Sequence, residues 1–293
     1  MRTTKYPVYV LSKGRADICK TSICFTEDGL EHYLVVEPQE YEEYRENFPN
    51  GNILVLPEGH YGKGAIPVRN WIWSHSIANG FDRHWEFDDN IRLIGRLNKG
   101  KRIRVNAYYA LTAVEEFTDR YENIAISGLN YQMFVTNDTK KPFYLNCHAY
   151  SALLIKNNIP YRWRLRYNAD TDLCLQVLHD KWCTINFNVF FADKTTTMVM
   201  KGGNTQRYQG DGRLIMARVL EETWPQYVTT TWKFGRPQHS VNWKKHFKHP
   251  LIRRKDIDWD NLKTNNFGMK LKAVDEVKSE SLKKILKEEN GKK

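Results

Sequence analysis

Short apolar segments that favour β-strands alternate with helical segments near the start of the chain, and this alternation limits the possible folds most strongly. Strands are expected at residues 6–11, 32–36 and 53–56, and a fourth ends at Asp88. Residues 37–48 and 68–79 have helical spacing. Such alternation is typical of an α/β fold with a mainly parallel sheet flanked by helices. We therefore predict this fold class.

The fourth strand ends in an acidic run, because residues 84–90 read HWEFDDN. Adjacent carboxylates at a strand end repel each other and lose hydration unless a cation neutralises them. The usual cation is Mg²⁺ or Mn²⁺, which takes oxygen ligands from one or two carboxylates and from substrate phosphates. Asp88, Asp89 and Asn90 therefore indicate a metal and phosphate site. The alternative is a simple turn with Asn90 in a left-handed conformation.

The expected topology favours the metal site over the turn. Ligands of open α/β sheets bind at the carboxyl ends of the strands. This rule places residues 12–15, residues 62–64 and the acidic run on one rim of the sheet. The glycines at 62 and 64 do not make a dinucleotide-binding turn, because Pro67 stands where the third glycine would be, and no P-loop pattern is present.

Charge and composition restrict the function classes. The 293 residues are 41% hydrophobic and 13% aromatic, which fits a folded globular protein. The net charge is +11, and residues 241–293 hold 15 Lys and Arg against 8 Asp and Glu. A second basic cluster comprises Arg92, Arg96, Lys99, Lys101, Arg102 and Arg104. This distribution favours a polyanionic partner, of which nucleic acid is the commonest; an anionic membrane surface, a nucleotide-sugar pocket or solubility would explain part of it.

The five cysteines include no CxxC pair, so neither a zinc module nor a disulfide framework is expected. The sequence has no secretory signal and no apolar run of about 18 residues that would cross a membrane. We therefore expect no membrane partner and a cytoplasmic location.

The second half has a mixed pattern. A strand is expected at residues 124–127, and residues 146–157 fit a strand or a helix. Residues 161–167 alternate apolar or aromatic residues with Arg162, Arg164 and Arg166, so a strand there would place the three arginines on one face. A helix is expected at residues 172–178, and another at 269–289.

Two further features carry possible chemistry. Asp170 and Asp172 stand at a helix start, where one caps the helix and the other can serve as a general base. His239 is either a surface or packing residue or the ligand that completes a metal site begun by Asp88. Trp232 and Trp243 flank His239 and can stack on a sugar or base, although core packing is the favoured interpretation.

Five segments together resemble a glycosyltransferase of the GT-A type, and more specifically the TET-associated glycosyltransferase family of bacteriophages. They are YPVYVLSKGRAD, GKGAIPVRNWIW, HWEFDDNI, RYNADTDLCLQ and FGRPQHSVNW, which sample residues 6–243. Residues 246–293 lie outside these segments and are expected to form a basic helical extension. The resemblance implies a GT-A-like domain over residues 1–245, with a mixed acceptor-side half. It also implies transfer of sugars to hydroxymethylated or otherwise oxidised pyrimidines in DNA.

The resemblance assigns roles to residues. Ser12 and Arg15 would line the pocket for the donor nucleotide, Arg69 and Asn70 would approach the diphosphate or ribose, and Asp89 would lie nearer the ribose or sugar. Asp88, Asn90 and His239 would hold Mn²⁺ or Mg²⁺; asparagine is a weaker ligand than the aspartate usual at the third position. Asp170 matches the catalytic base of the pattern Glu-Asp-x-Asp-Leu and Asp172 the second aspartate, but Ala169 replaces the glutamate, so the choice between the two stays open.

We therefore expect a metal-dependent, inverting transfer of sugar from a nucleotide sugar, with a UDP-sugar as the first choice, to double-stranded DNA that bears modified pyrimidines. Phosphates would be gripped by Arg102, Arg104, Arg162, Arg164 and Arg166. If the gene is carried by a phage, the location is the host cytoplasm. Three alternatives stay open: a glycosyltransferase for polysaccharide or protein hydroxyls, a metal-dependent nuclease with Asp88, Asp89, Asp170 and His239 at its site, and a DNA-binding protein without catalysis.

Overall fold

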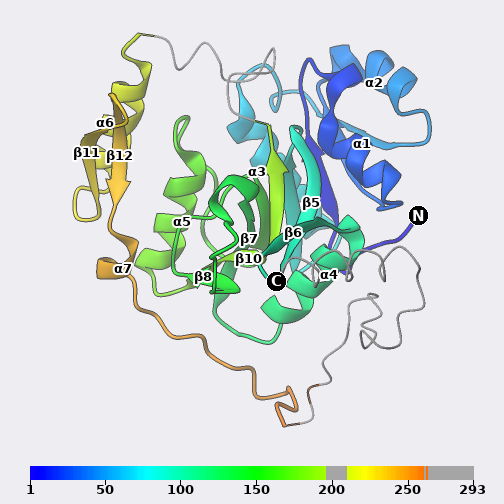
Figure 1. Ribbon diagram of the computed structural model, residues 1–293. Coiled ribbons are helices and arrows are strands. Elements are labelled where there is room, and N and C mark those ends of the chain that lie inside the picture. Colours follow the sequence, from blue (N-terminus) through cyan, green and yellow to red (C-terminus); the bar gives the residue numbers. More distant parts are fainter. Residues whose placement is uncertain (196–209, 261, 263–293) are drawn as a thin grey trace, which may run out of the picture. The chain divides into compact units, whose positions relative to one another are not determined.

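The computed structural model of the chain describes residues 1–195, 210–260 and 262 (Figure 1). Met1–Ile257 forms one compact unit, and a second unit begins at Asp258. The helix expected at residues 269–289, and with it most of the expected basic extension, lies outside the described residues. Within the described part of the chain, no helix has the length and apolar character needed to cross a bilayer.

A ten-stranded sheet forms the centre of the first unit. Its strands are β1 (Val8–Leu11), β2 (Tyr33–Val36), β3 (Asn52–Val55), β4 (Arg83–Asp88), β5 (Ile91–Asn98), β6 (Lys101–Arg104), β7 (Ile124–Tyr131), β8 (Phe143–Leu145), β9 (Ala152–Lys156) and β10 (Cys183–Lys194). The order across the sheet is β3-β2-β1-β4-β9-β7-β10-β5-β6, and β8 pairs with the first half of β10.

The sheet has a parallel half and a mixed half. In the first half, the pairs β3–β2, β2–β1 and β1–β4 are all parallel, as the alternation of strands and helices predicts. Beyond β4, the pairs β4–β9, β9–β7, β10–β5 and β5–β6 are antiparallel, and the pair β7–β10 is parallel. The predicted α/β class is therefore confirmed.

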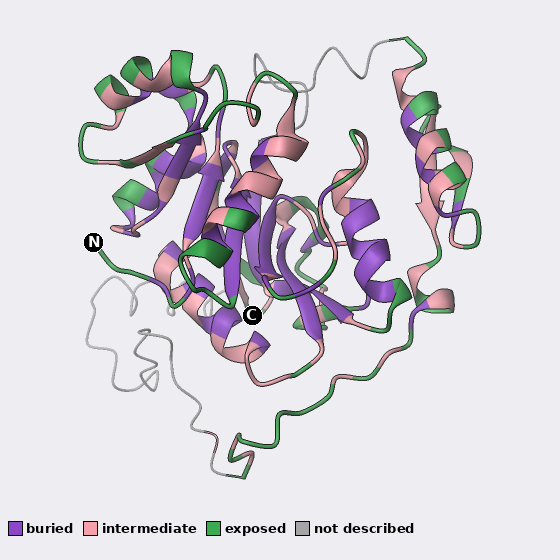
Figure 2. Cartoon of the chain, turned by 180° about the vertical axis from the view of Figure 1, so that it is seen from behind, coloured by how far each residue is buried: buried purple, intermediate pink, exposed green. Residues whose placement is uncertain are grey.

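Helices cover both faces of this sheet (Figure 1). The helices that contact the sheet are α1 (Lys20–Glu27), α2 (Tyr41–Asn47), α3 (Ala65–Ala78), α4 (Ala107–Thr118) and α5 (Ala169–His179). The chain also forms α6 (Gly212–Thr223), α7 (Trp243–His246) and the 3-10 turns η1 (Ala16–Ile18), η2 (Pro38–Glu40) and η3 (Gln132–Phe134). Figure 2 shows that the central strands are buried along most of their length. Burial of their apolar side chains between the helix layers is the main driving force for this arrangement.

Strand β4 explains how the acidic run is presented. Successive side chains of a strand point to opposite faces. Trp85 and Phe87 point toward α1 and α4, where Phe87 packs edge-on to Phe25 with ring centroids 5.0 Å apart. Glu86 and Asp88 point to the opposite face, toward α3. The pleat therefore places two carboxylates on the α3 side of the sheet, at its carboxyl edge.

The three predicted loops do meet at this edge. Glu37 follows β2 and its Oε2 accepts from Lys13 Nζ at 2.7 Å. Its Oε1 accepts from the backbone N–H of Gly62 at 3.0 Å. Glu37 therefore joins the loop after β1 to the glycine loop before α3, as expected for loops at the carboxyl ends of parallel strands.

One expected strand is absent. Residues 161–167 are irregular, so the prediction of a strand with three arginines on one face is wrong. The arginines instead find different partners: Arg162 lies over the ring of Trp73, and Arg164 pairs with Asp172. An alternating pattern predicts a strand only when a neighbouring strand can pair with it, and here the side chains bind to α3 and α5 instead. Residues 152–156, for which strand and helix were both open, form β9.

A two-stranded hairpin follows α6. It consists of β11 (Val228–Lys233) and β12 (Arg236–Val241), and both strands pack on α6 at one edge of the molecule (Figure 1). Lys233 pairs with Arg236, so the turn contains only Phe234 and Gly235. Beyond α7 the chain returns along the first unit, where Tyr121 and Arg253 form an isolated β-bridge.

Candidate active site

Asp88 ends β4 and is held by two cationic side chains. Its Oδ1 accepts from Arg69 Nη2 at 2.7 Å, and its Oδ2 accepts from Lys194 Nζ at 2.8 Å and from Ser151 Oγ at 2.7 Å. Burial alone would raise the pKa of Asp88, but Lys194 and Arg69 hold that pKa well below its ordinary value. Asp88 is therefore ionised, and its charge is compensated inside the protein.

Asp89 joins the loop after β1 to the acidic run. Its Oδ2 accepts from Ser12 Oγ at 2.9 Å, and its Oδ1 lies 2.5 Å from Arg15 Nη1. Ser12 Oγ also lies 2.7 Å from the hydroxyl of Tyr44. Burial raises the pKa of Asp89, although Arg15 and Ser12 oppose this. The structure therefore brings together three of the residues predicted to bind the donor.

Arg69 connects α3 to both carboxylates on its side of β4. Its Nη1 lies 2.7 Å from Glu86 Oε2, and the guanidinium lies 4.6 Å from the ring centroid of Trp163. Asn70 has a different environment, because its side chain donates to the carbonyl oxygen of Trp163 and accepts from the N–H of the same residue. Arg69 therefore lies at the acidic run, whereas the amide of Asn70 fixes the irregular segment at residue 163.

Lys194 is a site residue that the sequence analysis missed. It ends β10 and is only 15% exposed. Besides Asp88, its Nζ donates to Ser151 Oγ at 2.6 Å and to Tyr131 Oη at 3.1 Å. Nothing in the local sequence marks these residues, because Lys194 and Asp88 are 106 positions apart. Only the antiparallel and parallel pairings in the second half of the sheet bring them together.

Asp170 lies in the first turn of α5 and faces a histidine. Its Oδ2 is 3.3 Å from His148 Nε2, and its Oδ1 accepts from the N–H of Thr171 at 2.8 Å. Burial would raise the pKa of Asp170, but His148 together with Thr171 and Lys194 lowers it to about 2. The carboxylate is 36% exposed, so it is both ionised and accessible. His148 was also missed, since a single histidine in an irregular segment carries no pattern.

Asp172 differs sharply from Asp170, although only two positions separate them. Its side chain is fully buried and accepts from Arg164, from Gln176 Nε2 at 2.8 Å and from Trp224 Nε1 at 2.8 Å. Both carboxylate oxygens are therefore engaged by the protein. This set of contacts joins α5 to the irregular 161–167 segment and to the end of α6.

His239 lies on β12 and belongs to the same electrostatic neighbourhood as Asp170. Burial, together with the electrostatic effect of His148, lowers the pKa of His239 to about 4, although Asp170 opposes this shift. The imidazole is therefore neutral at pH 7. Trp243 stacks on His148 with ring centroids 6.1 Å apart and an interplanar angle of 11°. Trp232, in contrast, is 71% exposed, so the favoured interpretation that it packs in the core is wrong.

The acidic run has the chemistry for a divalent ion, but it is not a preformed metal site. Asn90 Oδ1 is buried without a hydrogen-bond partner in the described part of the chain, so it offers an unused oxygen ligand beside Asp88. Hard divalent ions take such oxygen ligands. Among residues 1–195, 210–260 and 262, however, no three His, Cys, Asp or Glu side chains are grouped as a metal centre. An ion that binds Asp88 must share its oxygens with Arg69, which donates to Oδ1, or with Lys194 and Ser151, which donate to Oδ2.

The arginines predicted to grip phosphates are largely used within the protein. Arg104 contacts Glu27 and Asp28 at 3.3 and 3.2 Å. Arg102 donates to the carbonyl of Gln132 at 3.3 Å. The three arginines between residues 161 and 167 have different partners: Arg162 donates to the carbonyls of Ile159 and Tyr161, Arg164 binds Asp172, and Arg166 lies over the ring of Tyr167.

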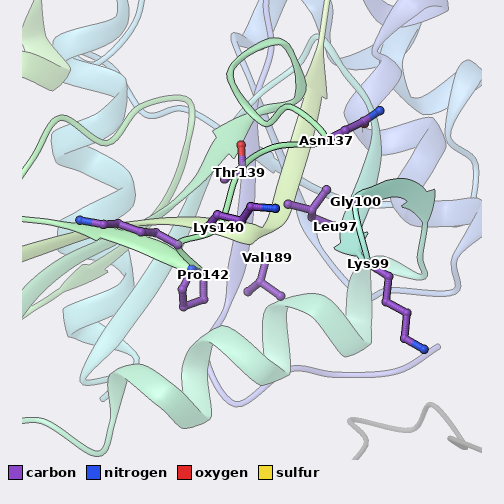
Figure 3. A pocket seen from close by; sticks show the side chains of 9 residues that line it. Leu97, Lys99, Gly100, Asn137, Thr139, Lys140, Pro142 and Val189 are labelled. Carbon is purple, nitrogen blue, oxygen red and sulfur yellow. The ribbon is translucent and has the colours of Figure 1, made fainter.

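A shallow pocket of about 480 Å³ lies apart from these carboxylates. It is formed by the turn between β5 and β6 and by the loop at residues 137–142. Figure 3 shows Lys140 directed across this pocket and Lys99 directed out of it. Because none of the predicted site residues lines the pocket, its basic lining marks a surface beside the site rather than the site itself.

Comparison with known proteins gives limited structural likeness. A crystal structure of glucosyl-3-phosphoglycerate synthase from Mycobacterium tuberculosis, in complex with Mg²⁺ and UDP, is 10% identical with a TM-score of 0.43, and the match covers 80% of this chain and 86% of that one. A putative nucleotide-diphospho-sugar transferase from Desulfovibrio desulfuricans G20 is 8% identical with a TM-score of 0.36, over 63% and 80% of the two chains. No curated protein sequence matches.

The sequence itself gives the assignment. Residues 6–203 match the family model described as TET-Associated Glycosyltransferase. This match covers more than half of the chain and includes the acidic run, Asp170 and Lys194. The protein is therefore a glycosyltransferase and belongs to the TET-associated glycosyltransferase family.

Proposed function

We propose that the protein transfers a sugar from a nucleotide sugar, with UDP as the preferred nucleotide, to a hydroxymethylated pyrimidine in double-stranded DNA. The observation that carries the proposal is the position of Asp170: an ionised, accessible carboxylate close to the cations that hold Asp88. Sugar transfer requires both kinds of group. The attacking hydroxyl requires a proton acceptor, and the donor diphosphate requires positive charge.

The donor would lie along the carboxyl edge of the parallel strands. Arg15 and Ser12 would contact its nucleotide portion, with Asp89 near the ribose or sugar. Arg69 and Lys194 carry positive charge at the place where the diphosphate would lie. Charge develops on the diphosphate as the bond to the sugar breaks, so fixed cations that strengthen their contacts at that moment lower the barrier.

A divalent ion, Mg²⁺ or Mn²⁺, would be held by Asp88 and Asn90, with His239 as the predicted third ligand. The bound ion would add positive charge at the leaving diphosphate. The unused buried oxygen of Asn90 and the neutral imidazole of His239 support this assignment, since metal ligands must be unprotonated.

Asp170 would accept the proton of the acceptor hydroxyl as its oxygen attacks the anomeric carbon, which gives inversion at that carbon. His148 contacts the same carboxylate, so it would hold Asp170 in position while the acceptor approaches. The family relationship and the basic surface support DNA as the acceptor. A hydroxymethyl group in a duplex reaches a carboxylate at a sheet edge when its base is turned out of the stack.

The proposal is tested by product analysis. Purified protein is incubated with Mn²⁺ or Mg²⁺, a panel of nucleotide sugars and duplex DNA that contains 5-hydroxymethylcytosine or 5-hydroxymethyluracil. After digestion, mass spectrometry of the nucleosides should detect a gain of one sugar, and NMR of the product should detect inverted configuration relative to the donor. The gain should disappear in Asp88→Ala and persist in Asp256→Ala, an exposed surface carboxylate.

Other outcomes would point to the open alternatives. Hydrolysis of the donor without a mass gain on DNA would overturn the proposed acceptor and favour a polysaccharide or protein hydroxyl. Nicking of plasmid DNA by the protein with Mn²⁺ alone would favour the nuclease. Equal activities of the wild type and Asp88→Ala in all of these assays would contradict the assignment of the acidic run.

A further inference from the structure

The tip of the β11–β12 hairpin exposes two large aromatic side chains. Trp232 is 71% exposed and Phe234 is 89% exposed. Removing aromatic rings from water stabilises a fold, so rings of this size that stay in water contribute little to it. Their position at the end of a hairpin therefore calls for a partner outside the chain.

The backbone at the tip reinforces this conclusion. Phe234 and Gly235 have φ values of 55° and 70°, so both turn residues are in the left-handed region that a two-residue type I′ turn requires. Glycine and asparagine adopt this conformation readily, whereas a bulky side chain there is strained. The turn thus holds a phenylalanine where asparagine would fold better, and the ring gains no burial in exchange.

Charge indicates what the partner is. Lys233 and Arg236 flank the turn, and both are exposed. Lys244 and Lys245 follow in α7, beyond the end of β12 that is opposite the tip. Aromatic rings beside basic side chains suit single-stranded or distorted nucleic acid, because bases stack on the rings while phosphates contact the cations. A protein partner would not require this combination, and the chain as a whole carries a net charge of +11.

The hairpin also connects the tip to the candidate active site. His239 lies on β12 in the electrostatic neighbourhood of Asp170 and His148. Five positions separate it from Phe234, which corresponds to roughly 16 Å of extended strand. At about 3.4 Å per base along a strand, this is a distance of about five bases. A strand whose modified base reaches Asp170 would therefore pass within reach of the tip.

We propose that Trp232 and Phe234 form an aromatic wedge that stacks on bases of the acceptor nucleic acid about five bases from the base that is modified. This inference rests on the proposed function for its choice of acceptor. The wedge enters a base step about five bases from the modified base, and Lys233 and Arg236 bind the adjacent phosphates. Apolar or aromatic side chains that enter base steps act in this way in other DNA-binding proteins.

The informative variant is Phe234→Asn, because it separates folding from binding. Asparagine relieves the strain of the turn, so the variant should unfold at the same or a higher temperature than the wild type. Loss of the ring should weaken binding to a fluorescein-labelled duplex with one hydroxymethylpyrimidine by about tenfold, measured by fluorescence anisotropy. Phe234→Trp should retain affinity, and Ile77→Ala, which removes an exposed apolar side chain from α3, should match the wild type.

Three results would overturn the inference. The first is unchanged affinity in Phe234→Asn, the second is an equal loss in Ile77→Ala, and the third is a change of oligomeric state with unchanged DNA affinity, which would make the tip a protein contact. Sugar transfer by the wild type is measured separately. A wild type that binds DNA through the tip but transfers no sugar would leave the wedge standing and overturn the proposed reaction.

Discussion

Asp170 and Asp172 have the same side chain but differ in exposure and in hydrogen-bond partners. Successive residues of a helix are rotated by about 100°, so positions two apart point in nearly opposite directions. Asp170 points toward His148 and remains accessible, whereas Asp172 points into the core and is saturated by hydrogen bonds. The sequence leaves the choice of base open, and the orientation of α5 favours Asp170.

Replacement of Asp170 by Asn should therefore reduce kcat for sugar transfer by about 100- to 10,000-fold, the usual range for loss of a general base. Binding of the nucleotide sugar, measured by calorimetry, should stay within a factor of about 3, since the donor would contact Arg69 and Lys194 rather than Asp170 in the proposed arrangement. A variant with undiminished kcat would contradict the assignment.

Lys194 donates to Asp88 Oδ2, so it competes with a metal ion for this oxygen. In Lys194→Met this competing cation is absent, so the affinity for Mn²⁺ should rise by about tenfold, equivalent to about 1.4 kcal/mol. Titration calorimetry without nucleotide measures this directly. Lys5→Met, which removes an exposed cation paired with Asp119, is the control and should have no effect. Unchanged Mn²⁺ affinity in Lys194→Met would mean that the ion does not bind at this oxygen of Asp88.

Glu115 gives a pH-dependent contribution to stability. It is buried in α4, where its oxygens accept from the N–H groups of Lys5 and Tyr6 and from Trp85, and burial raises its pKa to about 7. The native state therefore binds a proton at a higher pH than the unfolded chain. This contribution to the free energy of unfolding grows as the pH falls from about 7 to about 4.5, and disappears above that window.

The comparison of wild type with Glu115→Gln isolates this group. The change in the free energy of unfolding between pH 7.5 and pH 5 should differ between the two proteins by on the order of 2 kcal/mol, with the wild type gaining more at low pH. Urea unfolding at both pH values provides the measurement. Parallel pH profiles would show that Glu115 does not titrate in this range.

At the level of elements, α5 packs through buried apolar side chains, and one buried carboxylate, Asp172, adds polar contacts to two neighbouring segments. Asp172→Asn keeps the size of the side chain but removes its charge, and its amide group would face the guanidinium of Arg164 or the indole N–H of Trp224. Two buried hydrogen-bond donors that face each other lower the free energy of unfolding by about 2 to 4 kcal/mol. The midpoint of urea unfolding should fall accordingly, while Asp170→Asn, two positions away, should unfold near the wild-type midpoint. Equal midpoints for Asp172→Asn and the wild type would contradict the docking role.

Elements defined by local patterns could be predicted from the sequence, and those defined by distant partners could not. The strands up to Asp88 and the helix α3 have their own periodicity, so their prediction is confirmed within a few residues. The irregular 161–167 segment has an alternating pattern but no strand to pair with. In the same way, Asp88 and Asp170 carry local signals, whereas Lys194 and His148 enter the site only through tertiary contacts.

At the level of the whole molecule, net charge is a weaker guide than the placement of the charged groups. Two of the arginines that the sequence marks as phosphate contacts, Arg104 and Arg164, are paired with carboxylates. We therefore expect few phosphate contacts in the complex with DNA. With about four contacts, affinity for duplex DNA would fall roughly 100-fold between 50 and 200 mM salt. Anisotropy titrations across this range measure the slope, and an affinity independent of salt would contradict a phosphate-binding surface.

The contact between Lys194 and Asp88 has a consequence for how the protein is made. During synthesis the acidic run leaves the ribosome 106 residues before the lysine that neutralises it. At about 5 to 20 residues per second this delay lasts roughly 5 to 20 s. For that time Asp88 has Arg69 but not its second cation, and the edge of β4 that later pairs with β9 is open. The nascent chain therefore cannot complete the contacts of Asp88 before β10 joins the sheet, so premature termination ahead of residue 183 leaves the proposed donor site incomplete.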